Sequence, residues 1–287
     1  MEKIKLLIDT DMGGDVDDAL ALTAALRCPN VEVVGVSTCY LRPHWRAQVA
    51  CDILRRCGAG DVPVAAGCGA PLAGAWDERH IHDTGAVPAQ PHALSPLHGS
   101  DFILQKARQT AGLSILAIGP LTNLALALLK EPQALAGCRL YLMGGRLTSA
   151  QPEWNILCDP EAASLVLGAG LDVTLVPFEV TSQCQFSQAE VDAFTGTEYR
   201  DFLRCMMDAF TQKFGFLPMM HDPMALAMLA APELFTFERR RIAVETQGRL
   251  TRGTLVDYGP DAAGNVRAAA ADQPAFRRWI TEKLMDG

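Results

Sequence analysis

Residues 6–22 read LLIDTDMGGDVDDALAL and contain three signals in direct succession. The apolar run at residues 4–8 predicts a buried strand, and the acidic stretch with Gly13 and Gly14 predicts a turn. From Asp17 to Cys28, apolar residues recur at helical spacing. A strand, a turn and a helix in this order form the first half of a βαβ unit, which indicates a parallel sheet.

The same alternation of strand and helix continues through residue 178. Further strands are expected at 31–36, 62–66, 113–118, 139–143 and 173–178, and helices at 46–57, 101–111, 121–130 and 159–170. The strands read as continuous apolar runs, which is typical of a parallel sheet with helices on both faces. We therefore predict an α/β fold with a doubly wound, mostly parallel, Rossmann-like sheet. Ligands of such sheets bind beyond the carboxyl ends of the strands.

The order of elements changes after about residue 185. Helices come first, one of them opening at Asp222-Pro223. Two β-rich stretches follow, RIAVET at 241–246 and RGTLVDY at 252–258, and a final helix is expected near 274–285. No linker rich in Gly, Ser or Pro separates this half from the first. We expect residues 1–287 to form one domain.

The composition is that of a protein with a large core and an acidic surface. Of 287 residues 49% are hydrophobic, and 33 acidic against 25 basic residues give a net charge of −8. This charge disfavours nucleic acid and anionic lipid as partners. No apolar run approaches the ~18 residues of a membrane span, and no signal peptide is recognised, so a cytoplasmic protein is expected. Nine cysteines without a CxxC pair favour reduced, buried thiols.

The acidic turn indicates a metal site. Five carboxylates fall close together, those of Asp9, Asp11, Asp15, Asp17 and Asp18. Like charges at this density cannot stay ionised and partly buried without a cation. Ca²⁺ and Mg²⁺ both prefer such oxygen ligands. Capping of the following helix explains at most two of the five.

Two other acidic motifs share parts of this pattern. An EF-hand loop starting at Asp9 needs Glu at its twelfth position, where Leu20 stands, so this motif is excluded. The strand followed by Asp-x-Asp also resembles the start of the Mg²⁺-dependent, haloacid-dehalogenase-type phosphatases, with Asp9 as nucleophile. That family expects Thr or Val where this chain has Gly13. The phosphatase is retained as an alternative hypothesis.

A series of ordered motifs resembles the nucleoside hydrolases that prefer inosine and uridine. They are Asp9-Thr10-Asp11 with Asp17-Asp18, PVAAGCGAPL at 63–72, His80-Ile81-His82, GPLTN at 119–123, Met143-Gly144-Gly145, Glu153-Trp154-Asn155 followed by DPEAA at 159–163, and His221-Asp222-Pro223. The series spans nearly the whole chain. The resemblance implies the nucleoside hydrolase fold and hydrolysis of the N-glycosidic bond of a ribonucleoside or a related ribosyl compound.

The resemblance further implies one Ca²⁺ per chain. Its protein ligands would be the carboxylates of Asp11, Asp18 and Asp222 and the backbone carbonyl of Ile118. Asp11 would also be the catalytic base that takes a proton from the attacking water. This role agrees with the chemistry of the residues, because a carboxylate-rich pocket stabilises an oxocarbenium-like transition state.

The resemblance also assigns the substrate contacts. The ribose would be bound by Asp17, Glu153 and Asn155. His82 and His221 would lie near the leaving base, and His221 would protonate it with an unperturbed pKa near ~6.5. In some members of the family a Trp stacks on the base instead, a role that Trp154 can fill. By itself, His221-Asp222-Pro223 is more typical of a helix start with Asp222 as N-cap.

Two departures from the family pattern affect the amino-terminal half. The acidic turn is two residues longer than the commonest pattern, so Asp15 can replace Asp17 or Asp18 in its role. The segment after residue 38 is shorter and lacks the usual Asn, offering Arg42 and His44 instead.

A third departure lies between Gly145 and Glu153. This stretch is shortened and lacks the Asn that normally contacts the 5′ hydroxyl of the sugar. Contacts to the 5′ end should therefore be weaker than those to the 2′ and 3′ hydroxyls. We expect 2′-deoxynucleosides to be nearly inert and 5′-substituted ribonucleosides to be tolerated.

The leading hypothesis is thus a calcium-dependent ribonucleoside hydrolase of nucleoside catabolism and of purine or pyrimidine salvage. The alternatives are the Mg²⁺-dependent phosphatase and a non-catalytic, calcium-dependent ribose-binding protein. Retention of Asp11 argues against the last, because a site that only binds needs no base. The resemblance suggests a homodimer or homotetramer.

Overall fold

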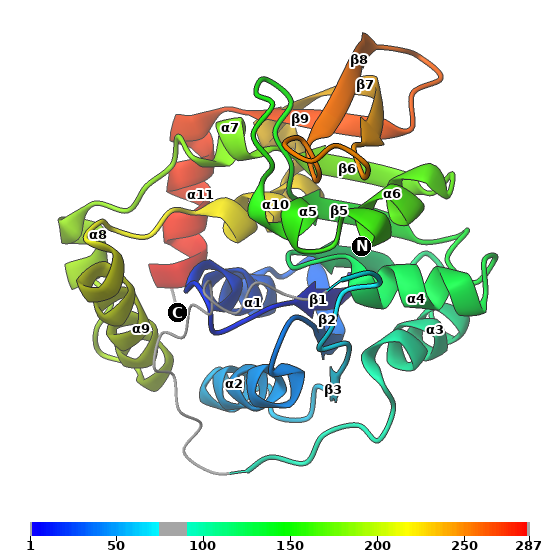
Figure 1. Ribbon diagram of the computed structural model, residues 1–287. Coiled ribbons are helices and arrows are strands. Elements are labelled where there is room, and N and C mark those ends of the chain that lie inside the picture. Colours follow the sequence, from blue (N-terminus) through cyan, green and yellow to red (C-terminus); the bar gives the residue numbers. More distant parts are fainter. Residues whose placement is uncertain (1, 75–90, 286–287) are drawn as a thin grey trace.

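The computed structural model describes residues 2–74 and 91–285, and its described strands form a nine-stranded sheet in the order β3-β2-β1-β4-β5-β6-β9-β7-β8 (Figure 1). The strands are β1 Ile4–Thr10, β2 Val31–Thr38, β3 Val64–Ala66, β4 Ser114–Ala117, β5 Arg139–Met143, β6 Asp172–Val176, β7 Phe235–Val244, β8 Leu255–Pro260 and β9 Val266–Ala271. Strands β1 to β6 and β9 are parallel, whereas β7 runs antiparallel to β9 and β8. The predicted α/β class with a mostly parallel sheet is confirmed.

Helices cover both faces of the sheet (Figure 1). They are α1 Asp17–Arg27, α2 Pro43–Arg56, α3 Gly99–Gln109, α4 Thr122–Lys130, α5 Trp154–Cys158, α6 Pro160–Gly168, α7 Phe178–Thr181, α8 Gln188–Asp192, α9 Glu198–Phe214, α10 His221–Ala230, the 3-10 helix η2 Pro232–Leu234 and α11 Gln273–Met285. Helices α1, α2, α9, α10 and α11 enclose one apolar core, and α3, α4 and α6 enclose a second.

Strand β1 separates the two cores. Leu6 and Ile8 belong to the core beneath α1, while Leu7 between them belongs to the core beneath α4. This alternation follows from the two-residue period of a strand. All three side chains are fully buried, as the continuous apolar run of residues 4–8 predicted. The chain winds outward from β1 in both directions, toward β2 and toward β4, so the ends of these strands form the switch point at which ligands bind.

The sequence reading missed the strand β9. Its sequence, VRAAAA, contains four alanines, and alanine is depleted in strands. Pairing with β6 on one side and β7 on the other holds this segment extended, so tertiary contacts override the local preference. In contrast, α11 begins within one residue of its expected start.

Two further expectations from the sequence concern membrane spans and the state of the cysteines. In residues 2–74 and 91–285, no helix combines the length and the apolar character that a membrane span requires. All nine cysteines lie in the described ranges; they are free thiols, and only Cys205 is exposed.

Candidate active site

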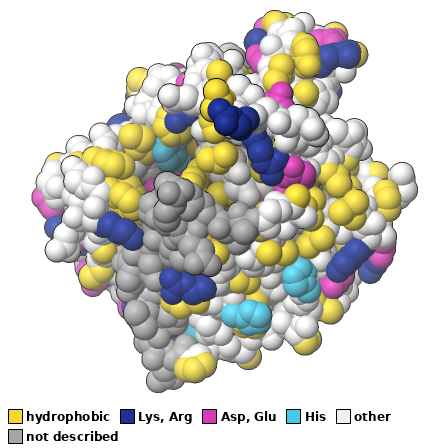
Figure 2. Space-filling model, in the orientation of Figure 1, with side chains coloured by type: hydrophobic (Ala, Val, Ile, Leu, Met, Phe, Trp, Pro, Cys, Tyr) yellow, Lys and Arg dark blue, Asp and Glu magenta, His cyan; other side chains and the backbone are white. Residues whose placement is uncertain are grey.

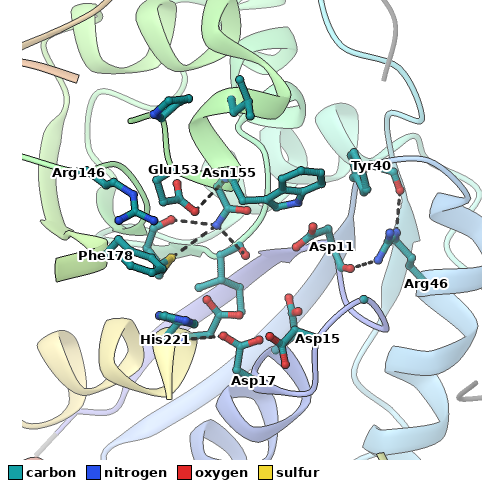
Figure 3. A pocket seen from close by; sticks show the side chains of 18 residues that line it. Asp11, Asp15, Asp17, Tyr40, Arg46, Arg146, Glu153, Asn155, Phe178 and His221 are labelled. Atoms are coloured by element: carbon teal, nitrogen blue, oxygen red, sulfur yellow. Dashed lines mark hydrogen bonds between the residues drawn. The ribbon is translucent and has the colours of Figure 1, made fainter. Parts of the chain in front are cut away.

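The acidic turn lies at the carboxyl end of β1 and lines a pocket of about 390 Å³. Four of its carboxylates face this pocket, those of Asp11, Asp15, Asp17 and Asp18. The opposite wall comes from the segment that follows β5 and from α5, and α10 supplies His221 and Asp222 (Figure 3). Segments more than 200 residues apart in the chain thus meet at one edge of the sheet.

Three buried carboxylates form the centre of the site. Asp17, Asp18 and Asp222 each offer an oxygen, and these oxygens lie within 4.8 Å of one another. Burial, followed by repulsion from neighbouring carboxylates, raises the pKa of each of these groups well above its ordinary value. Few donors compensate this charge: the hydroxyl of Thr10 donates to Asp18, and the backbone N–H of Asp222 donates to Asp17 over 3.3 Å. The group therefore fits a hard divalent cation.

Asp222 does not cap its helix. Helix α10 begins one residue earlier, at His221, its N-cap is Met220, and the cap position has no side-chain hydrogen bond. The reading of Asp222 as N-cap is therefore wrong, and the carboxylate is 3% exposed within the acidic group. Asp159 does have the capping role, accepting a hydrogen bond from the backbone N–H of Ala162.

Asp15 and Asp11 lie outside this group of three. The side chain of Asp15 accepts a hydrogen bond of 2.6 Å from the backbone N–H of Val16, and burial raises its pKa to about 7. Burial also raises the pKa of Asp11, while the neighbouring Arg46 opposes that shift. Asp17 and Asp18 both stay in the group, so Asp15 replaces neither of them there.

Close packing brings the end of β4 against Asp11. A Cβ on Gly119 would lie 2.8 Å from the backbone nitrogen of Asp11 and 3.1 Å from its carboxylate, so only glycine fits. The preceding Ile118 lines the pocket, and its backbone N–H donates to the carbonyl of Asp9 over 2.9 Å. The Ile118 carbonyl accepts a hydrogen bond of 3.3 Å from the amide of Asn155.

Asp9 is not one of the residues that line this pocket. Its carboxylate is 1% exposed and accepts hydrogen bonds from Ser37 over 2.6 Å and from Asn123 over 2.8 Å. Burial raises its pKa to about 7, and its second oxygen has no hydrogen-bond partner. A phosphatase nucleophile has to face the substrate, so this position argues against the phosphatase alternative.

The Glu153-Trp154-Asn155 motif forms the start of α5. Glu153 caps the helix and accepts hydrogen bonds from the backbone N–H groups of Asn155, Ile156 and Gly145. The amide of Asn155 donates to the carbonyls of Ile118 and Met143. The Trp154 ring meets Tyr40 edge to face, with ring centroids 6.0 Å apart. All three residues of the motif line the pocket, as the resemblance implied.

His221 lies in a stacked column of side chains on the pocket wall (Figure 3). Its ring stacks on Phe178 at 5.3 Å, and its Nδ1 lies 2.7 Å from the hydroxyl of Thr181. The guanidinium carbon of Arg146 is 3.6 Å from the centroid of the Phe178 ring. Burial, and then the charge of Arg146, lower the pKa of His221 to about 4. The expected unperturbed pKa near ~6.5 is therefore wrong, and His221 is neutral at neutral pH.

His82 and the rest of the motif at 80–82 lie outside the described residues. Arg42 and His44, suggested for the shortened segment after β2, are both exposed and do not line the pocket.

Arg46, one turn further along α2, is the basic residue of this segment that reaches the site. It is 3% exposed, and its guanidinium donates to the backbone carbonyls of Tyr40, Asp11 and Met12. Tyr40 and Leu41 form the turn it holds, and both have positive φ angles of 65° and 39°, which are strained for residues other than glycine.

Sequence reasoning did not identify Arg46, Arg146 or Phe178. Arg46 and Arg146 fall in the two segments that are shorter than in the family pattern. That shortening was the one signal in the sequence that could have pointed to them. A lone Phe or Arg carries no spacing pattern, and only the fold brings these side chains to the pocket.

The chain is similar to known proteins over nearly its whole length. The family model described as inosine-uridine preferring nucleoside hydrolase matches residues 6–278. The chain is 32% identical to a probable uridine nucleosidase 1 of Oryza sativa subsp. japonica, over 97% of this chain and 92% of that protein. It is also 32% identical to the non-specific ribonucleoside hydrolase RihC of Salmonella enteritidis, with 97% of each chain covered.

Among solved structures, the purine-preferring ribonucleoside hydrolase from Gardnerella vaginalis superimposes with a TM-score of 0.87 at 26% identity, covering 98% of both chains. The chain therefore belongs to the inosine-uridine preferring nucleoside hydrolase family and is a ribonucleoside hydrolase, which cleaves ribonucleosides to base and ribose.

Proposed function

We propose that this hydrolase is calcium-dependent, with one Ca²⁺ per chain held by Asp11, Asp18, Asp222 and the backbone carbonyl of Ile118. The supporting observation is the buried group of Asp17, Asp18 and Asp222, which has few hydrogen-bond donors to offset its charge. Ca²⁺ accepts six to eight oxygen ligands in flexible geometry, and Mg²⁺ requires a stricter octahedron. Carboxylates from the acidic turn and from α10, together with a carbonyl at the end of β4, form an irregular ligand set that suits the larger ion. When bound, the ion polarises hydroxyl groups of substrate and water.

Asp11 acts as the base in this proposal. Its carboxylate accepts the proton of the water that adds to C1′ as the N-glycosidic bond breaks. The close contact with Gly119 and the hydrogen bonds of Arg46 to the Asp11 and Met12 carbonyls hold this carboxylate in place. The neighbouring carboxylates stabilise the positive charge that develops on the ribose ring.

The remaining side chains position the substrate. Asp17, Glu153 and Asn155 hydrogen-bond the ribose. Trp154, supported edge-on by Tyr40, provides an aromatic surface for the base. His221 contacts the leaving base as a neutral hydrogen-bonding group oriented by Thr181, and not as a protonated acid. The resemblance adds His82 to the proposed contacts of the base.

The proposal has three broader parts: a cytoplasmic location, a homodimer or homotetramer, and a role in nucleoside catabolism that serves purine or pyrimidine salvage. The resemblance supports the last two. Light scattering coupled to gel filtration measures the assembly directly. A monomer at working concentration would contradict the oligomeric part alone.

A nucleoside panel tests the proposal. The protein is stripped with EDTA, reconstituted with Ca²⁺ or Mg²⁺, and incubated with ribonucleosides while free base, reducing sugar and phosphate are measured separately. Equal release of base and sugar that depends on Ca²⁺ supports it, and Asp11→Asn serves as the inactive control. Phosphate release would favour the phosphatase, and binding without turnover would favour a ribose-binding protein.

A further inference from the structure

We propose that Arg146 is a specificity residue that binds an anionic group on the 5′ carbon of the ribose, and that the substrates include ribonucleoside 5′-monophosphates. This inference rests on the proposed function for the orientation of the sugar. In the reaction, water adds its oxygen to C1′, and the electron pair of the C–N bond leaves with the base nitrogen, which gains a proton. The phosphate ester stays intact, so the products are free base and ribose 5-phosphate.

The first argument is the availability of the Arg146 guanidinium. Arg146 lines the pocket, and its Nε is buried without a hydrogen-bond partner. Within residues 2–74 and 91–285 Arg146 forms no ion pair. Its guanidinium carbon lies over the face of Phe178, 3.6 Å from the ring centroid. Stacking on a ring fixes the plane of a guanidinium while leaving the N–H groups at its edge free to donate.

The second argument is the distribution of charge. In the described part of the chain, Arg46 is the other cation that lines the pocket, and its Nε and Nη1 donate to three backbone carbonyls, which hold it at the acidic turn. Glu153, the nearest acidic residue along the chain in this wall, accepts hydrogen bonds from three backbone N–H groups and not from Arg146. Among the described residues, Arg146 is therefore the pocket cation that no backbone carbonyl is shown to hold. A planar guanidinium binds phosphate through two parallel hydrogen bonds.

The third argument is the direction of the sugar. With the 2′ and 3′ hydroxyls at the group of Asp17, Asp18 and Asp222, C1′ has to face the base Asp11. C4′ and the 5′ carbon then point to the opposite side. Asp11 and Arg146 lie on opposite sides of the pocket, with Glu153 and Asn155 between them and Asp17 below (Figure 3).

The fourth argument is the loop that carries Arg146. The segment 146–152 is shortened and lacks the Asn that the resemblance places at the 5′ hydroxyl. The loop is fixed instead by the carboxylate of Glu179, which accepts a hydrogen bond of 2.8 Å from the backbone N–H of Leu147. A neutral amide that suits a hydroxyl is thus absent, and a cation that suits a phosphate faces the pocket.

The test compares three substrates on the calcium-loaded enzyme: inosine, 5′-deoxyinosine and inosine 5′-monophosphate, or the uridine series if uridine is the better nucleoside. Free base and ribose 5-phosphate are measured. We expect the monophosphate to have a kcat/KM at least equal to that of the nucleoside. Arg146→Met should lower the ratio of monophosphate to 5′-deoxynucleoside by about 10- to 100-fold, the range of a charged hydrogen-bonded contact. Arg146→Lys should give an intermediate ratio, because it keeps the charge without the planar fork.

Arg252→Met is the matched control. Arg252 also belongs to this side of the molecule, but it pairs with Glu161 and does not line the pocket, so the ratio should stay unchanged. The inference is overturned if the nucleoside is hydrolysed and the monophosphate is not. It is also overturned if Arg146→Met lowers kcat/KM equally for all three substrates. Failure of the proposed function looks different, since no nucleoside would be cleaved. If no nucleoside is cleaved, calorimetric titration with the same compounds still tests the inference, because the Kd values give the ratio of monophosphate to 5′-deoxynucleoside.

Discussion

Replacing Arg46 by Met should weaken both the fold and the catalytic turn. The side chain is buried, and it donates to the carbonyls of Tyr40, Asp11 and Met12. Met fills a similar volume but leaves these acceptors without their charged donor. Removing one partner of a buried charged network costs about 3–5 kcal/mol, and ~2–3 °C of Tm per kcal/mol applies to chains of this size. We expect Tm to fall by about 6–15 °C.

The charge of Arg46 gives this variant a second signature. Arg46 opposes the raised pKa values of Asp11 and Asp18, so it offsets part of their repulsion. In EDTA no other cation of the described residues does so, and with Ca²⁺ the ion takes over part of that role. The fall in Tm should therefore be larger in EDTA than in Ca²⁺, and Arg46→Lys should remove most of that difference while kcat stays low.

Differential scanning calorimetry in both buffers, with kcat measured in Ca²⁺, provides the readout. Arg108→Met is the control, because it breaks an exposed ion pair with Glu131, which is worth about 1 kcal/mol or less. A Tm within ~2 °C of the parent protein, or an equal loss in EDTA and in Ca²⁺, would refute the reasoning.

Four further outcomes are expected. Metal analysis should find about one calcium per chain, and chelation should lower Tm, because an ion that binds only the folded state stabilises it; zinc bound by thiolates would contradict this. Asp11→Asn should reduce kcat by more than ~10²-fold, while Asp17→Asn should mainly raise KM; near-native turnover of the Asp11 variant would rule out its role as base. Since the folded pKa of His221 is lowered to about 4, its contribution to stability should be complete above pH ~6.5 and decrease as the pH falls toward 4; His221→Gln should flatten the pH dependence of Tm in that range, and an unchanged slope would contradict the shift. Finally, 2′-deoxynucleosides should show a far lower kcat/KM than 5′-deoxynucleosides, and the reverse order would overturn the proposed orientation of the sugar.

The first half of the sheet could be predicted because each signal was local. Leu6, Leu7 and Ile8 are apolar on both sides of a strand, and Gly13 and Gly14 mark the turn that follows. The spacing of charges in the acidic turn indicated Asp17 and Asp18, and the family resemblance indicated Asp222. The fold brings these three side chains together.

The rest depends on contacts between distant segments. The alanines of β9 become a strand only because β6 and β7 flank them. Arg146 reaches the pocket because Phe178, the first residue of α7 after β6, supports its guanidinium. The lowered pKa of His221 comes from burial, which a sequence pattern does not report.

The buried hydrogen bonds of Asp9 link correct folding to activity. Asp9 stands opposite Ser37 in the β1–β2 register, and Ser37 and Asn123 donate to its carboxylate. A slip of β1 by one residue would turn this carboxylate toward apolar side chains and break both hydrogen bonds. The same slip would also displace Asp11, which follows Asp9 by two residues in the chain. A misaligned chain would therefore lose stability and the position of its catalytic base together.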